Sequence, residues 1–146
     1  MPPLGKDRPT AEEFDEIVDA LRVLTPEVPV LSEESANIED EQRLGWTRYW
    51  LIDHLDGTKE FVARNGEFAV MLGLAIDGWA QVGVVFQPVT DKLYAGVVGE
   101  GATLEQHGKR REIRVSEVAE PRKLKLVVSR SHRNRAVGRV VDELGI

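Results

Sequence analysis

The sequence has no cysteine, no long apolar run and no excess of basic residues. The absence of cysteine excludes disulfide scaffolds, thiolate metal sites and cysteine nucleophiles. No apolar run approaches the roughly 20 residues that a membrane-spanning helix needs, and the N-terminal MPPLGKDRP lacks the apolar core of a signal peptide. We therefore expect a cytoplasmic protein without a transmembrane segment, and peripheral association with a membrane stays open.

The charge balance narrows the class of partner. The chain carries 25 acidic and 19 basic side chains, for a formal net charge of −6. This balance argues against a nucleic-acid polymer held along an extended basic face. It leaves a small phosphorylated substrate open, because a bound cation can offset the repulsion between carboxylates and phosphate. With 146 residues, of which 42% are hydrophobic and 30% charged, the composition predicts a globular chain the size of one domain.

The first part of the chain has a helical pattern. Apolar residues recur every three or four positions over residues 11–24, and Thr10 and Glu13 have the spacing of a capping box. The pattern therefore predicts a helix over these residues. The segments that follow are predicted as a strand over 28–31, a loop or a frayed turn over 32–47 and a buried strand over 49–52.

Beyond residue 67 the pattern is typical of strands. Residues 68–76 and 79–86 flank Asp77-Gly78, which is a strong signal for a two-residue hairpin turn. Trp50 and Trp79 fall in or beside strands, so we expect both in the core. Further strands are predicted over 93–98, 102–106, 112–115 and 125–129, joined by turns at 88–91, 99–101 and 107–108, and a helix over 133–144 with Gly145 as its C-cap. The fold class is therefore α+β, with a mainly antiparallel sheet and flanking helices.

Four carboxylates stand at predicted strand ends. Glu33 and Glu34 follow the strand over 28–31, and Asp53 and Asp56 follow the strand over 49–52. If both strands end at one edge of a sheet, these carboxylates come together and repel one another unless they share a cation. Hard oxygen ligands suit Mg²⁺, which commonly shares its ligand shell with a substrate phosphate. The pattern thus predicts a Mg²⁺ site.

The two residues after Asp56 suggest phosphate chemistry. Gly57 allows the backbone to approach a ligand closely, and Thr58 offers a hydroxyl and an N–H at the start of a helix. Together with the carboxylates they indicate two-metal phosphate hydrolysis, in which metal ions activate a water and hold the leaving oxygen. A purely structural interpretation stays open on spacing alone, because Asp-Gly is also an ordinary turn.

Longer strings add a family resemblance. LSEES at 31–35 and WLIDHLDGTKEFVARNGEF at 50–68 resemble the signature of the inositol monophosphatase family of Mg²⁺-dependent, lithium-sensitive phosphatases. The segments 59–61, 64–68 and 129–132 (KEF, RNGEF and SRSH) are similar, more narrowly, to CysQ-type 3′(2′),5′-bisphosphate nucleotidases. Those enzymes remove the 3′-phosphate of adenosine 3′,5′-bisphosphate in sulfur assimilation. The resemblance implies a layered α/β/α sugar-phosphatase fold, with inositol or sugar phosphates as the alternative substrate class.

The resemblance also implies roles for individual residues. Glu33, Asp53 and Asp56 match the family's metal-binding carboxylates, and Leu55 matches the position whose backbone carbonyl joins the metal shell. Glu34 is expected to lie outside that shell. The implied catalytic residues are Glu33, Asp56 and Thr58, and the Thr58 hydroxyl with Glu33 would position the attacking water. The implied substrate-binding residues are Leu55, Asp56, Gly57, Thr58 and Lys59.

Two departures from the family pattern bear on activity. His54 stands where the family has proline, so a fixed backbone dihedral is lost and a modest loss of site precision is expected. The second departure is extent, because the family's further metal-binding aspartate lies in a W-D-x-A-A motif that this chain, ending at Ile146, does not contain. We expect one incomplete phosphatase domain over residues 1–146, lacking the C-terminal domain.

An incomplete domain suggests a second function class. The chain would then be a catalytically impaired remnant that binds metal or phosphate weakly, or that works only after pairing with another chain. Sheet edges and apolar surface that a missing domain would have covered are expected to be exposed, and this favours self-association.

Overall fold

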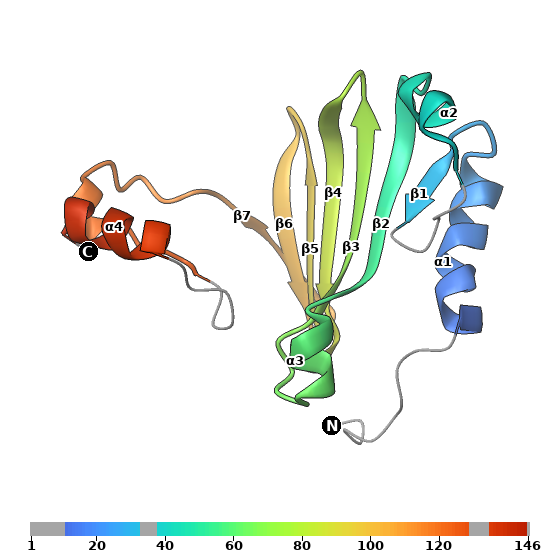
Figure 1. The fold of residues 1–146 in the computed structure, drawn as a ribbon. Coiled ribbons are helices and arrows are strands. Elements are labelled where there is room, and N and C mark those ends of the chain that lie inside the picture. The colour runs from blue at the N-terminus through green and yellow to red at the C-terminus, as the bar shows by residue number, and fades with distance from the viewer. Residues whose placement is uncertain (1–10, 33–37, 129–134, 146) are drawn as a thin grey trace. The chain divides into compact units, whose positions relative to one another are not determined.

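The computed structural model describes residues 11–32, 38–128 and 135–145 (Figure 1). The chain divides into two compact units, Met1–Ile113 and Arg114–Ile146, and each is described by itself. The single incomplete phosphatase domain therefore stays a prediction. Among the helices in the described ranges, none is long and apolar enough to cross a membrane.

The first unit is built on a seven-stranded sheet whose strands lie side by side in chain order. β1 runs parallel to β2, and every other neighbouring pair is antiparallel. The strands are β1 (Val30–Ser32), β2 (Arg48–Asp56), β3 (Ala69–Ile76), β4 (Trp79–Gln87), β5 (Lys92–Val97), β6 (Gly101–Gln106) and β7 (Lys109–Ile113). This mainly antiparallel sheet with flanking helices confirms the predicted fold class.

The predicted turns of the meander are present. Asp77 and Gly78 have φ of 51° and 79°, the left-handed values that a two-residue hairpin of this kind requires. His107 and Gly108 repeat this geometry with φ of 51° and 71°. β7 starts at Lys109 rather than at residue 112, because the tight turn lets pairing with β6 resume at once, with Lys109 opposite Gln106. A 3-10 turn, η1 (Pro88–Thr90), joins β4 to β5.

The helices of the first unit agree with the prediction except in one place. α1 (Ala11–Leu24) has the predicted bounds, and Thr10 of the predicted capping box lies outside the described residues. α2 (Asp40–Leu44) falls within the segment predicted to be a loop or a frayed turn, and a regular helix was not predicted there. A helix of five residues is too short to show a recognisable apolar period. α3 (Thr58–Val62) follows β2.

The second unit contains a 3-10 turn, η2 (Pro121–Lys123), and α4 (Arg135–Leu144). Gly145 has a φ of 69° and its N–H donates to the Val141 carbonyl at 2.9 Å, which confirms the predicted C-cap. The strand predicted over 125–129 was wrong for residues 125–128, and Ser129 lies outside the described residues. An apolar β-branched run becomes a strand only beside a partner strand, and the described part of this unit offers none.

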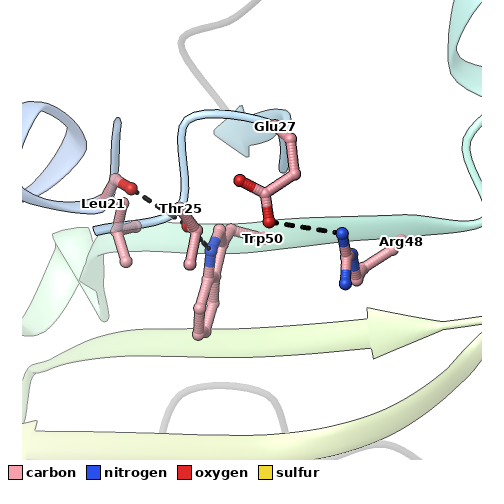
Figure 2. Close-up of polar contacts among 5 residues, drawn as sticks. All are labelled: Leu21, Thr25, Glu27, Arg48 and Trp50. Carbon is pink, nitrogen blue, oxygen red and sulfur yellow. Dashed lines mark hydrogen bonds and ion pairs between the residues drawn. The ribbon is translucent and has the colours of Figure 1, made fainter. Parts of the chain in front are cut away.

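Hydrogen bonds fix the end of α1 to β2 (Figure 2). The Trp50 indole Nε1 donates to the Thr25 hydroxyl at 2.9 Å, and that hydroxyl donates to the Leu21 carbonyl at 3.0 Å. An exposed ion pair joins Arg48 and Glu27 at 3.3 Å beside them. Because Trp50 is on β2, these contacts hold α1 against the strand that leads to the candidate site.

The two tryptophans differ in their environment. Trp50 is half-buried between α1 and the sheet, whereas Trp79 is 76% exposed at the hairpin between β3 and β4. The prediction that Trp79 lies in the core was therefore wrong. Its position beside a turn places it at the end of the sheet, where few side chains of neighbouring strands can cover it.

We expect Trp50→Phe to lower the free energy of unfolding by about 1 kcal/mol, because it removes one hydrogen bond while keeping most of the apolar contact. Arg48→Gln is expected to cost less than about 0.5 kcal/mol, because the ion pair it breaks is exposed. Urea denaturation followed by circular dichroism measures both. Equal losses of unfolding free energy in the two variants would contradict the conclusion that the Trp50 hydrogen bond holds α1 against β2.

Candidate active site

The parallel pair β1 and β2 defines the edge where the candidate site lies. Ser32, the last residue of β1, is opposite Ile52, one residue before Asp53. Because β1 and β2 are parallel, their carboxyl ends point toward the same edge of the sheet, and β2 continues four residues beyond Ile52 to Asp56. Glu33 and Glu34 lie outside the described residues, so their place in the site stays a prediction.

The two aspartates lie within β2. The prediction that they follow the strand was therefore wrong. Backbone pairing with β3 continues past Ile52, with Asp53 opposite Met71 and Asp56 opposite Ala69. The register shifts between these two pairs, which marks a β-bulge. Polar side chains in the last positions of β2 resemble a strand end in the sequence, but backbone bonds carry the strand through them. The bulge changes the direction in which this part of the strand presents its side chains.

The backbone of Leu55 is held from both sides. Its N–H donates to the Asp53 carboxylate oxygen Oδ1 at 3.0 Å, and its carbonyl accepts a hydrogen bond from the Thr58 hydroxyl at 3.3 Å. The Leu55 side chain is buried, whereas Asp56 and Thr58 are exposed. This turn thus presents the Asp56 carboxylate and the Thr58 hydroxyl to solvent on a fixed backbone. Lys59, the next residue of α3, is also exposed.

Gly57 occupies a position that other residues fit poorly. Its φ of 90° and ψ of 42° are left-handed, and its carbonyl accepts the Phe61 N–H at 2.9 Å, which begins α3. A Cβ atom at this position would lie 2.8 Å from the Glu67 carbonyl oxygen. The sequence predicted a close approach to a ligand here. The structure gives a second reason for glycine, because the protein's own chain already lies against this residue.

The segment between α3 and β3 is part of the site's surroundings that sequence reasoning missed. Asn65 Oδ1 accepts the Glu67 N–H at 2.9 Å. Gly66 has a φ of 79°, and a Cβ there would lie 3.2 Å from the Val89 side chain in η1. Phe61 and Phe68 make an edge-to-face contact with ring centroids 5.0 Å apart. An Asn-Gly pair is typical of a turn, but no local pattern indicates that this turn packs against Gly57.

His54 and Asp53 occupy opposite faces of β2. His54 is only 4% exposed and shares its face with Ile52, which is also buried, whereas Asp53 is half-buried. Successive side chains of a strand point to opposite faces. The histidine that replaces the family proline is thus directed away from the Asp53 carboxylate.

An open groove of about 590 Å³ lies on the Asp53 face of the sheet. The groove forms because Gly73 and Gly83 lie opposite each other on β3 and β4 and have no side chains to fill the space above the sheet. Leu51 is 44% exposed beside them. Apolar surface is therefore open on this face. Whether it supports self-association stays a prediction.

The oxygen donors of the described residues are compatible with Mg²⁺. Within residues 11–32, 38–128 and 135–145, no three histidine, cysteine, aspartate or glutamate side chains form a group that could hold a metal ion. Asp53 and Asp56 supply two carboxylates and Leu55 a backbone carbonyl, all hard oxygen ligands of the kind Mg²⁺ prefers. Because Asp53 engages only Oδ1 in its bond to Leu55, its other carboxylate oxygen is available in this donor set.

Comparisons with known proteins identify the family of this chain. The model of the inositol monophosphatase family matches residues 11–142. The chain is 45% identical, over 129 residues, to the 3′(2′),5′-bisphosphate nucleotidase CysQ of Escherichia coli K12, covering 88% of this chain and 50% of that protein. The nucleotidase of the same name from Buchnera aphidicola is 36% identical, over 88% of this chain and 47% of that protein. The chain thus spans about half the length of the curated relatives it matches.

Solved structures of the same family superpose on this chain. The crystal structure of CysQ from Bacteroides thetaiotaomicron, a bacterial member of the inositol monophosphatase family, superposes with a TM-score of 0.68 at 30% identity. The match covers 91% of this chain and 53% of that structure. The inositol monophosphatase from Anabaena superposes with a TM-score of 0.64 at 33% identity. The match covers 77% of this chain and 42% of that structure.

Proposed function

This chain belongs to the inositol monophosphatase family, and on that premise we propose that it acts as a Mg²⁺-dependent phosphomonoesterase on adenosine 3′,5′-bisphosphate. The observation that carries the proposal is the turn from Asp53 to Thr58, which presents a carboxylate and a hydroxyl on a fixed backbone. The 45% identity to a named bisphosphate nucleotidase supports the nucleotide as substrate.

The proposed reaction consumes one water. Its oxygen bonds to phosphorus, the bond from phosphorus to the 3′-oxygen breaks, and that oxygen takes up a proton. The products are adenosine 5′-monophosphate and inorganic phosphate. When bound, Mg²⁺ supplies positive charge to the phosphate oxygens and promotes ionisation of the attacking water.

The residues of the chain would divide the remaining work. Asp53, Asp56 and the Leu55 carbonyl would hold Mg²⁺ together with Glu33. The Thr58 hydroxyl already donates its proton to Leu55, so its oxygen is left to accept a hydrogen bond from the attacking water. Glu33 would orient the same water.

The phosphate would meet a second group of residues. Gly57 and Thr58 would contact its oxygens. The exposed Lys59 would supply a compact positive charge, as lysine does at many phosphate sites. The proposal includes a cytoplasmic location and a role in sulfur assimilation, as the resemblance to the bisphosphate nucleotidases implies.

Two alternatives stand beside this proposal. Inositol or sugar phosphate is the alternative substrate class, supported by the superposition on an inositol monophosphatase. The other is the catalytically impaired protein that the sequence analysis raised as a second function class. Such a remnant would bind Mg²⁺ or phosphate weakly without turnover.

Phosphate release by the purified chain tests the proposal. We expect release from adenosine 3′,5′-bisphosphate in Mg²⁺, little from inositol 1-phosphate, and none after EDTA until Mg²⁺ is restored. Turnover of inositol 1-phosphate alone would favour the alternative substrate class. A folded protein that releases no phosphate from either compound would favour the remnant.

A further inference from the structure

The turn at Gly57 is in contact with a loop that none of the proposed catalytic roles uses. This loop joins α3 to β3 over residues 63–68. On one side, the Glu67 carbonyl oxygen lies only 2.8 Å from the position that a Cβ of Gly57 would take. On the other side Gly66 packs against the Val89 side chain, with a Cβ position 3.2 Å from Cγ1. The loop therefore fills the space between the candidate site and η1.

Asn65 gives this loop its shape. Its Oδ1 accepts the Glu67 N–H at 2.9 Å, and its own N–H donates to the Glu60 carbonyl at 3.2 Å. The first bond fixes the peptide just before the Glu67 carbonyl, and the second fixes the loop to α3. Arg64 and Gly66 on either side have φ of 55° and 79°, so both neighbours hold conformations that are unfavourable for most residues. A specific hydrogen bond is needed to favour this arrangement over other loop conformations.

We infer that Asn65 is a positioning residue for the turn Asp56–Thr58. Its side chain sets the Glu67 carbonyl, and the Glu67 carbonyl limits where Gly57 and its neighbours can move. Asn65 itself is exposed, and neither of its two hydrogen bonds above involves a group that we assign to the reaction. The kinetic consequence rests on the proposed function, whereas the effect on the turn does not.

Loss of this restraint should affect the chemical step more than substrate binding. A displacement of about 1 Å in a group that orients the attacking water can cost up to about a hundredfold in rate. Phosphate binding depends mainly on charge and tolerates such a displacement better. Asn65→Ala is therefore expected to lower kcat by about tenfold, with KM changed by less than about threefold.

Amide hydrogen exchange and steady-state kinetics on the full chain test the inference. The Phe61 N–H reports on the turn directly, because it donates to the Gly57 carbonyl. We expect its exchange in Asn65→Ala to be faster by about fivefold, since one side-chain hydrogen bond to the loop is lost. Asn65→Asp keeps an acceptor oxygen at the same place and is expected to restore both exchange and kcat.

Asp91→Ala is the matched control. It removes another bond from a side chain to a backbone N–H, since Asp91 Oδ2 accepts the His107 N–H at 3.1 Å, together with an exposed contact of the same oxygen to the His107 ring. Neither contact involves the loop over 63–68. We expect it to leave Phe61 exchange and kcat within about twofold of wild type. Wild-type exchange at Phe61 in Asn65→Ala would overturn the inference. If the wild-type chain shows no turnover but exchange responds as expected, the proposed function fails and the positioning role stands.

Discussion

Asp56→Asn is expected to reduce phosphate release from adenosine 3′,5′-bisphosphate by about 100- to 1000-fold. The substitution keeps the size and shape of the side chain but replaces a charged oxygen ligand by a neutral amide. Asp56 is exposed at the end of β2, so removing its charge should have little effect on stability. Steady-state assays in Mg²⁺ measure the loss, and thermal unfolding checks that the fold is kept.

Asp77→Asn is the control for that experiment. It makes the same chemical change in an exposed turn, where a φ of 51° is as acceptable to asparagine as to aspartate. Asp77 joins β3 to β4 at the end of β3 remote from Asp56, which pairs with Ala69 at the start of that strand. Its activity should equal that of wild type. Equal activity of the two variants would remove Asp56 from the proposed metal site.

Gly57→Ala is expected to lower the free energy of unfolding by about 3 kcal/mol and to abolish turnover. A left-handed conformation costs a residue other than glycine about 1 kcal/mol. The added methyl would also meet the Glu67 carbonyl oxygen at 2.8 Å, and overpacking of this kind costs about 1–3 kcal/mol. Denaturant unfolding measures the stability, and phosphate release measures the activity.

Gly78→Ala separates the two contributions. Gly78 has a similar φ of 79°, but a Cβ there has no atom within 4 Å. It should therefore show only the backbone cost of about 1 kcal/mol and keep its activity. A loss at Gly57 no larger than the loss at Gly78 would mean that the loop over 63–68 yields easily. The contact between Glu67 and Gly57 would then restrain nothing.

Local patterns in the sequence were sufficient for most elements of the fold. The helix over 11–24 and the hairpin at Asp77-Gly78 were predictable because each depends on neighbouring residues, through apolar spacing or through left-handed backbone geometry. The strand predicted over 125–129 is absent from the described residues 125–128 for the opposite reason. Its formation depends on a partner strand, which a local pattern does not describe.

The candidate site shows the same division. The sequence by itself predicted which residues carry the chemistry, because the string over 50–68 resembles a family signature in which carboxylates, a glycine and a threonine have assigned roles. Only the tertiary structure decided how they are held. The parallel pairing of β1 and β2, the bulge after Asp53 and the contact of Glu67 with Gly57 all join residues distant along the chain or depend on a neighbouring strand. Such contacts follow from packing and register, which no local sequence pattern specifies.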